Sequence, residues 1–375
     1  MKSARRATLD DVARLAGVSL GSASRALSVP DQVKPATLAK VLQAVAQLGY
    51  VRNGAAQALA SRRTCTVAAI YPTLGNPIFA MSIHSLQQTL WAHGYQLLVA
   101  SHEYKPEREI DVVRAVVERG VDAIVLVGTD HSDAVYELIR RHGLPYVLTW
   151  AQDDSRHPHC VGFSYYDAAY RMAQLVVGHG HTRIALCAGG AAGNERVRAR
   201  VAATTAALAS AGLILRPDWV IEQPFSFEGG REAVRQIVRQ TVRISDRPTA
   251  LICGTDLHAI GAIDECRARG IRVPEDLSVT GFDDIEIAAL SNPPLTTVRV
   301  PSAEIGVRAA RRIVALLEGE NLPAALPLET DIVVRASLQR IGPPRLFAGR
   351  AARATPTGGD DDTRVVDVSA SSETP

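Results

Sequence analysis

Apolar residues recur every three or four positions through the first fifty residues, and this spacing predicts three short helices. The first is expected from Leu9 to Ala16, the second from Leu20 to about Leu27, and the third from about Pro35 to Leu48. Their apolar faces together can close one small core. The third helix is expected to turn five side chains inward: Leu38, Val41, Leu42, Val45 and Leu48.

The residues between the first two helices predict a tight turn. Thr8 and Asp11 can form a capping box, Gly17 supplies the left-handed backbone that ends the first helix, and Ser19 can cap the second. Val18 would fill the angle between the two helices. We interpret this pattern as a helix-turn-helix, and an ordinary helical hairpin is the alternative.

The second helix would present short side chains and one long hydrogen-bond donor to solvent. A helix of little bulk can lie deep in the major groove of DNA, and Arg25 is long enough to reach a guanine or a phosphate. The predicted groove-facing residues are Leu20, Gly21, Ser22, Ser24 and Arg25.

The charge of the chain is divided unevenly. Residues 1–63 hold ten Lys or Arg and three Asp, a net charge of +7, and the remainder holds 31 basic and 36 acidic residues, a net charge of −5. A basic end on an acidic body is typical of a protein that meets a polyanion at that end, although a solvated basic terminus is the alternative.

An alanine-rich segment, NGAAQALASRR at residues 53–63, follows the three helices. It favours helix but lacks an apolar stripe, so it would be marginally stable alone. A flexible linker is one interpretation. The other is a hinge helix that forms when two copies meet on DNA and that inserts Leu59 as a wedge into a minor-groove base step.

Seven short apolar runs follow, and segments of helical length separate most of them. This alternation predicts a doubly wound α/β protein with parallel strands, in two tandem units that divide near Gly162. The predicted strands are residues 67–71, 96–101, 123–128, 146–150, 183–189, 250–254 and 277–282.

Composition narrows the class of protein. With 375 residues, of which 47% are apolar, two or three domains are expected. The five cysteines are scattered, which argues against a disulfide framework or a zinc site. No apolar stretch reaches the length of about 18 residues that a membrane span needs, and the amino terminus is charged and polar where a signal peptide needs an apolar core, so we predict no membrane association and a cytoplasmic location.

Signals of catalysis are weak. No phosphate loop, GxGxxG fingerprint or nucleophile elbow is present, so no catalytic residue and no cofactor is predicted. The histidine-rich runs HPHC (157–160) and HGH (179–181) lie in predicted loops without a third ligand, and we interpret them as surface or turn-capping histidines rather than a metal site.

Several motifs resemble the lactose and galactose repressor (LacI/GalR) family of bacterial transcription regulators. They are TLDDVARLAGVSLGSASRAL at 8–27, NPIF at 76–79, GHTRIAL at 180–186, SVTGFDD at 278–284 and PPLTTVRVP at 293–301. They follow the family's order from about residue 8 to 340. Arg52 departs from the pattern, because the family usually has proline there. The resemblance adds Thr8, Asn53, Gln57 and Leu59 to the predicted DNA contacts.

The resemblance also implies the domain organisation. A helix-turn-helix domain would occupy 1–52, a hinge helix 53–63, a two-lobed effector and dimerisation domain similar to periplasmic binding proteins 64–342, and a tail 343–375. The first lobe would comprise 64–162 and 292–325, and the second 163–291 and 326–342. The tail is rich in Pro, Gly, Ser and Thr without apolar heptads, so we predict disorder there and a dimer rather than a tetramer.

An effector site is implied between the two lobes, at the carboxyl ends of the strands. Rings there would pack on a sugar-like or small carboxylated molecule, and Arg200 and Asp283 would make directional bonds. Phe79 and Phe225 as core residues, and Asp256 as a helix cap, are the alternatives. The implied effector residues are Phe79, Trp150, Arg200, Phe225, Thr255, Asp256 and Asp283.

We therefore predict a homodimeric transcriptional regulator, a repressor, that binds a near-palindromic operator in successive major grooves and responds to a small effector. Two alternatives stay open at this point. One is a cytoplasmic solute-binding protein, against which the missing signal sequence counts, and the other is a Rossmann-like enzyme with a regulatory DNA-binding head, against which the missing cofactor loop counts.

Overall fold

The computed structural model describes residues 7–52, 63–152, 159–241, 243–320 and 322–342. The chain divides into two compact units, of which the first ends at Cys65 and the second begins at Thr66. The predicted hinge contacts Asn53, Gln57 and Leu59 lie outside the described residues, and so does the predicted tail.

The first unit is a helix-turn-helix followed by a third helix. In α1, Thr8 and Asp11 form the capping box, and Gly17 ends the helix with a φ of 68°. The Ser19 hydroxyl accepts a hydrogen bond from the backbone of Ser22 at the start of α2. The predicted turn is therefore confirmed. The helices are α1 (Leu9–Ala16), α2 (Leu20–Ser28), the 3-10 turn η1 (Pro30–Gln32) and α3 (Pro35–Leu48).

Fewer residues of α3 are buried in the core of this unit than the sequence predicts. Val41 and Ala44 are the buried residues of α3, whereas Leu42 is 50% exposed and Leu48 is 36% exposed, so the prediction that these two leucines face inward is wrong. The facing side chains from α1 and α2 are mainly alanine and valine. They cover only one stripe of α3, and Leu42 and Leu48 lie to the side of it.

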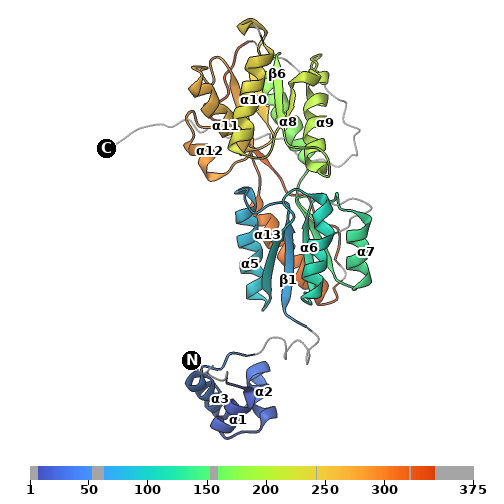
Figure 1. Ribbon diagram of the computed structural model, residues 1–375, viewed down its shortest axis with the longest axis vertical. Helices are drawn as coiled ribbons and strands as arrows, with labels where there is room; N and C mark the ends of the chain where they lie inside the picture. The colour runs from blue at the N-terminus through green and yellow to red at the C-terminus, as the bar shows by residue number, and fades with distance from the viewer. Residues whose placement is uncertain (1–6, 53–62, 153–158, 242, 321, 343–375) are drawn as a thin grey trace, which may run out of the picture. The chain divides into compact units, whose positions relative to one another are not determined.

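The second unit has two lobes, each built on one sheet. The first sheet is parallel throughout and has the strand order β2-β1-β3-β4-β5. Helix α13 packs against α5 beside this sheet, and α6 and α7 bury an apolar cluster with its opposite face (Figure 1). The strands are β1 (Thr66–Tyr71), β2 (Gln96–Ser101), β3 (Ala123–Val127), β4 (Tyr146–Thr149) and β5 (Cys160–Val161), and the helices are α5 (Ile78–Ala92), α6 (Pro106–Glu118), α7 (Asp133–Arg141) and α13 (Ser302–Leu317).

The sheet of the second lobe has the order β11-β10-β9-β8-β6-β7, and only β11 is antiparallel to its neighbour. Helices α10 and α11 pack together over one face of it, and α8 and α9 pack together beside it (Figure 1). The strands are β6 (Ile184–Ala188), β7 (Val220–Glu222), β8 (Ala250–Cys253), β9 (Ser278–Asp283), β10 (Thr296–Arg299) and β11 (Asp331–Val333). The helices are α8 (Tyr165–Gly178), α9 (Glu195–Ser210), α10 (Phe227–Gln240), α11 (Asp256–Ala268) and α12 (Glu286–Leu290), with 3-10 turns at Pro217–Trp219 and Ile244–Asp246.

All seven predicted strands are present, and the two-lobed parallel architecture is confirmed. The strands that were not predicted are β5, β7, β10 and β11, which have two to four residues each. Runs this short carry little hydrophobic periodicity. They are strands because a longer neighbour already offers a row of unpaired backbone groups.

The chain returns to the first lobe later than predicted. We expected the crossing at about Asn292, but Thr296–Arg299 pairs with β9 in the second lobe, and the side chains of Thr296 and Thr297 are fully buried there. The crossing therefore falls after Arg299, immediately before α13. Two further crossings connect β5 to α8 and α13 to β11.

The two histidines of the HGH run lie in different surroundings: His179 is half-buried at the end of α8, as a turn-capping histidine would be, whereas His181 is fully buried, so its interpretation as a surface or turn-capping histidine is wrong. His179 Nδ1 lies 2.9 Å from the carbonyl of Leu175 at the end of α8, and fully buried His181 lies between the Thr249 hydroxyl and the carbonyl of Gln339. The described residues contain no group of three His, Cys, Asp or Glu side chains placed to hold a metal ion. Nor does any described helix have the length and apolar character to cross a membrane.

His181 should make the fold sensitive to acid. Burial lowers the pKa of its imidazole from 6.5 to about 4, so the unfolded chain binds the proton more readily than the folded chain. Stability from this residue is present at pH 7 and is lost as the pH falls from about 6.5 toward 4, by about 2 kcal/mol between pH 7 and 5. We expect His181→Gln to remove this part of the pH dependence of the unfolding free energy, measured by urea titration. The exposed His142→Gln is the control, and equal pH slopes for the His181 variant and the wild-type protein would contradict the assignment.

Candidate functional site

The first unit presents the predicted DNA-facing residues on one side of α2. Leu20 is 51% exposed, Gly21 and Arg25 are exposed, and Ser22 and Ser24 are half-buried. Arg25 forms no ion pair with any other described residue. The Thr8 hydroxyl is engaged by Asp11 in the capping box, at 2.7 Å. The arrangement leaves one long cationic side chain free above a face of small residues.

In the second unit, six of the seven predicted effector residues surround one small recess of about 30 Å³ between the lobes. The first lobe contributes aromatic rings at the ends of its strands, and the second lobe contributes charged and polar groups. Phe79 packs edge-on against Trp150 with ring centroids 5.1 Å apart. The six residues are Phe79, Trp150, Arg200, Phe225, Thr255 and Asp283.

Asp256 is placed differently from the prediction. Its carboxylate accepts hydrogen bonds from the Thr297 hydroxyl at 2.6 Å and from the backbone of Ile285 at 2.9 Å, and the residue is fully buried away from the recess. Thr255, not Asp256, is the N-cap of α11. Asp256 therefore connects β10 to the segment after β9 and does not line the recess, and its contact with an effector stays a prediction.

Arg200 and Asp283, a basic and an acidic side chain, lie in surroundings that disfavour charge. The Arg200 guanidinium lies 5.2 Å from the Tyr165 ring and 5.3 Å from the Phe282 ring, and it forms no ion pair with a described residue. Burial lowers its pKa, and burial together with Asp256 raises the pKa of Asp283 well above its ordinary value. A ligand group that bonds both side chains would satisfy the polar atoms that burial has stripped of water.

Strained backbone gathers at this site. Six non-glycine residues of the described chain have a positive φ, and four of them line the recess or the chamber next to it. Such conformations cost free energy and tend to persist where function requires a particular side-chain placement. The four are Glu103 (53°), Tyr104 (52°), Trp150 (60°) and Asp283 (131°).

Half of the residues that line the recess were not predicted from the sequence. Arg196 could have been recognised because it lies one turn before Arg200 on α9, and Asn76 begins the NPIF motif. Tyr104 had no sequence signal, since only the fold brings it within 5.0 Å of Phe225 across the cleft. The missed residues are Asn76, Ile78, Tyr104, Tyr165, Asn194 and Arg196.

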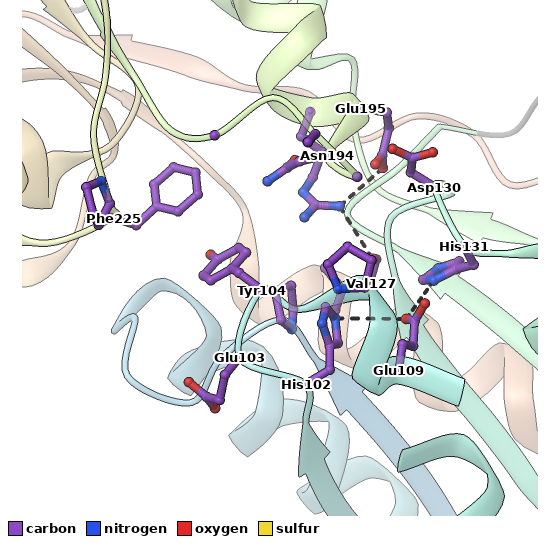
Figure 2. Close-up of a pocket in the computed structure, with 17 residues that line it drawn as sticks. His102, Glu103, Tyr104, Glu109, Val127, Asp130, His131, Asn194, Glu195 and Phe225 are labelled. Carbon is purple, nitrogen blue, oxygen red and sulfur yellow. Dashed lines mark hydrogen bonds and ion pairs between the residues drawn. The ribbon is translucent and has the colours of Figure 1, made fainter. Parts of the chain in front are cut away.

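A larger chamber of about 320 Å³ opens from the recess, and the two share Tyr104, Asn194, Arg196 and Phe225. Figure 2 shows its two walls: His102, Glu109 and His131 from the first lobe, and Asn194 and Glu195 from the second. We call the recess the inner site and this chamber the outer site.

The first turn of α9 fastens the lobes together beside the outer site. Glu195 accepts a hydrogen bond from the backbone of Thr129 at 2.9 Å, and Arg198 pairs with Asp130 at 2.9 Å. Arg196 approaches the carbonyl of Val127 at 3.4 Å (Figure 2). These contacts between the two lobes are all polar.

Known proteins match both units. Residues 8–53 match the model of bacterial regulatory proteins of the lacI family, and residues 173–338 match a periplasmic binding protein-like domain. The HTH-type transcriptional repressor PurR of Aliivibrio fischeri (strain MJ11) is 30% identical over 335 residues, which cover 88% of this chain and 98% of PurR. The chain belongs to the lacI family of bacterial regulatory proteins.

Two solved structures of transcription regulators have a similar fold. The transcriptional regulator CelR in complex with cellobiose is 30% identical, with a TM-score of 0.65 over 88% of this chain and 100% of CelR. The lac repressor dimer bound to operator and the anti-inducer ONPF has a TM-score of 0.78 and 24% identity over 89% of this chain and 100% of the repressor.

Arg52, at the position where the family resemblance predicts proline, ties the end of this unit to α2. Its guanidinium donates to the carbonyl of Leu27 at 3.1 Å and also contacts the Ser28 hydroxyl. The Ser28 hydroxyl in turn donates to the carbonyl of Ser24 at 2.7 Å. Arg52 thus supplies both hydrogen bonds and a positive charge at the carboxyl end of α2.

We expect Arg52→Ala to weaken operator binding by about fivefold to tenfold, because the end of α2 loses a cap that is worth about 1 kcal/mol. Arg52→Lys should restore little of it, since a single ammonium cannot bond Leu27 and Ser28 together. Fluorescence anisotropy with an operator fragment at fixed salt measures both variants. Full rescue by lysine would instead indicate that Arg52 contributes only charge.

Proposed function

We propose that this chain is a homodimeric transcriptional repressor of a metabolic operon that acts in the bacterial cytoplasm. Two α2 helices read successive major grooves of a near-palindromic operator, and a small effector in the inner and outer sites controls that binding. The observation that carries the proposal is the second-lobe cation Arg200, which is buried without an ion pair to a described residue and lines a recess that it shares with Phe79 and Trp150 of the first lobe. A bound ligand would supply the hydrogen bonds that this buried guanidinium lacks.

The mechanism follows from the position of the site. An effector that bonds Arg200 and Asp283 on one lobe and Phe79 and Trp150 on the other changes how the lobes close. Lobe movement alters the spacing of two heads in a dimer, so effector and operator binding are coupled by about 1 to 3 kcal/mol, equally in both directions. We take release of the operator by the effector as the direction of control.

The relatives support this regulator and neither of its alternatives. They are transcription regulators, and they match this chain along nearly their whole length. We therefore propose no enzymatic activity and no resident cofactor. The CelR complex with cellobiose supports an oxygen-rich effector for the present chain as well. The DNA contacts that we propose are Arg25 and its neighbours on α2, with Asn53, Gln57 and Leu59 from the segment that follows.

Arg25→Ala should weaken binding to the operator by about tenfold or more, because a long donor on the groove-facing side of α2 is lost. Arg14→Ala is the matched control, since Arg14 is an exposed arginine of α1 that pairs with Asp10. The measurement is anisotropy with a palindromic fragment from beside the coding region. Equal affinities for the Arg25 variant, the Arg14 variant and the wild-type protein would exclude α2 as the reading helix.

Arg200→Gln should abolish the response to an effector while the operator is still bound. A thermal-shift screen of sugars, sugar acids and aromatic acids identifies a binding molecule, because a ligand of the folded state raises the melting temperature. The exposed Arg239→Gln on α10 controls for loss of one positive charge. An Arg200 variant that still releases operator at the wild-type effector concentration would remove this cation from the effector site.

A further inference from the structure

Two cysteines of the second lobe lie side by side in adjacent strands. Cys187 in β6 and Cys253 in β8 are Cα partners in a parallel pair, so their side chains point to the same face of the sheet. Neither is more than 1% exposed, and both belong to the apolar cluster that α10 and α11 cover (Figure 1). Both are free thiols. Neighbouring strands lie about 4.8 Å apart, which is within the range of Cα separations that a disulfide can bridge.

His258 adds a base to this pair. It is fully buried in the first turn of α11, and its ring stacks on the Phe225 ring with centroids 5.6 Å apart. Its Nε2 lies 2.7 Å from the carbonyl of Pro224, which can only accept, so Nε2 carries a proton and donates there. The Nδ1 of the neutral ring therefore carries a lone pair, and it has no hydrogen-bond partner among the described residues. Such a buried acceptor is stabilised when a neighbouring group supplies a proton.

Two glycines in the first turn of α10 make room for this arrangement. A Cβ at Gly229 would lie 2.2 Å from the Pro224 carbonyl oxygen, and a Cβ at Gly230 would lie 1.9 Å from the carbonyl oxygen of His258. Larger residues at these positions would therefore separate α10 from α11 and move the Pro224 carbonyl. The orientation of the His258 ring is set by this carbonyl at Nε2 and by the Phe225 ring against its face.

The two thiols differ in acidity. A hydrogen bond with Cys253 is the main cause that lowers the pKa of Cys187, and the His258 imidazole lowers it as well. Burial, and then the neighbouring Cys187, raise the pKa of Cys253 well above its ordinary value. Burial lowers the pKa of His258, but Cys187 and the Pro224 carbonyl together raise it by more, so the imidazole can take up the proton that Cys187 releases. Cys187 is therefore the thiolate of the pair, and Cys253 stays a thiol.

Cys266 shows the effect of burial on a thiol in the same cluster. It is fully buried on α11, and burial raises its pKa to about 12. A thiol in such surroundings is protonated at neutral pH and reacts slowly, because the thiolate is the nucleophile. Cys187 is buried to the same degree, so its neighbours Cys253 and His258 are what distinguish it from Cys266.

We propose that Cys187 and Cys253 form a thiol pair that hydrogen peroxide oxidises to a reversible disulfide. Cys187 is the nucleophile, Cys253 is the resolving thiol, and His258 is the base that holds the proton of Cys187. A nucleophilic thiol next to an oriented imidazole, with a second thiol in the neighbouring strand, supplies the three groups that this chemistry needs. The inference does not depend on the proposed function, because it concerns only groups within the second lobe.

The reaction has two steps. The Cys187 thiolate attacks one oxygen of hydrogen peroxide, so that an S–O bond forms, the O–O bond breaks, and the departing hydroxide takes the proton from the His258 imidazolium to become water. The Cys253 sulfur then attacks the sulfenic acid sulfur of Cys187, so that the S–S bond forms, the S–O bond breaks, and the departing hydroxide takes the Cys253 proton. Two thiols are oxidised to one disulfide, and one peroxide is reduced to two water molecules.

We place the entry of peroxide at Phe225. Its ring stacks on His258 and also lines the outer site, so movement of this ring opens a path for a molecule close to water in size. The pair lies next to the strand ends at the cleft, because a Cβ at Gly254 would lie 3.3 Å from the Cys187 carbonyl oxygen and 3.5 Å from Arg200 Nε. Burial makes the oxidation slow, and the chemistry of the pair makes it selective.

The first test treats the full-length protein with hydrogen peroxide, blocks the remaining thiols after unfolding, and maps all cysteines by mass spectrometry. We expect a disulfide between Cys187 and Cys253 that dithiothreitol reverses, whereas the equally buried Cys266 keeps its thiol. Protein unfolded in urea should lose this selectivity, because every cysteine is then exposed. The proposal is wrong if Cys187 stays reduced in the folded protein, links to another cysteine, or is oxidised no faster than Cys266.

A second test separates the roles of the two thiols. Cys253→Ser should stop the reaction after the first step, so that Cys187 accumulates as a sulfenic acid that dimedone labels when the protein is unfolded. Cys187→Ser should slow oxidation of Cys253 by about tenfold or more, because the resolving thiol is protonated. Cys266→Ser is the control and should form the disulfide at the wild-type rate. Oxidation of Cys253 at an equal rate with and without Cys187 would remove Cys187 as the nucleophile.

A third test concerns His258 and uses the pH profile of Cys187 oxidation. Between about pH 6 and pH 8 an ordinary thiol gains roughly two orders of magnitude in thiolate, whereas the wild-type rate should change by about twofold at most. His258→Gln should slow the reaction at pH 7 by about tenfold or more and restore a steep rise with pH. If circular dichroism shows that this variant does not fold, the wild-type profile decides alone. A steep wild-type rise with pH would overturn the role of His258 as the base.

Discussion

Besides the three chain crossings and the Tyr104–Phe225 ring contact, the first turn of α9 joins the two lobes where it comes close to the end of β3. Gly128 has a φ of 89°, and a Cβ there would lie 2.1 Å from the Arg196 guanidinium and 2.4 Å from Glu195. A side chain at this position would displace the ends of both of these side chains, and the positive φ would strain any residue other than glycine. Glycine therefore permits the backbone contacts of Glu195 and Arg196 that enclose the inner and outer sites.

The closed cleft excludes water from charged and polar side chains. This desolvation determines which ligand groups the site can bind. Arg200 is held by aromatic faces instead of a counter-ion, and Asp283 is held next to buried Asp256. The ring faces stabilise a cation in such surroundings, but its N–H groups still lack hydrogen bonds. The same desolvation lowers the pKa of the His102 imidazole in the outer site.

Small residues recur where two parts must approach closely. In the head, alanines of α1 and α2 let the helices pack on a narrow stripe of α3, and Arg52 completes the end of α2. In the cleft, a Cβ at Gly189 would lie 2.1 Å from the Phe225 ring, so the absence of a side chain there leaves room for the ring beside the site. Polar contacts of the first turn of α9 join the two lobes, and each lobe is packed around its own apolar cluster.

The sequence by itself determined the local features: the capping box at Thr8, the left-handed Gly17, the seven longer strands, and the set of residues at strand ends from which six meet around one recess. These depend on neighbours a few positions apart, so their signals lie in short stretches of sequence. Only the tertiary structure decided that β10 stays in the second lobe, that Asp256 bonds Thr297, and that His102, Glu109 and His131 meet. Those outcomes depend on contacts between residues that are up to 41 positions apart in the sequence. No short stretch of sequence determines which partner a buried polar group bonds.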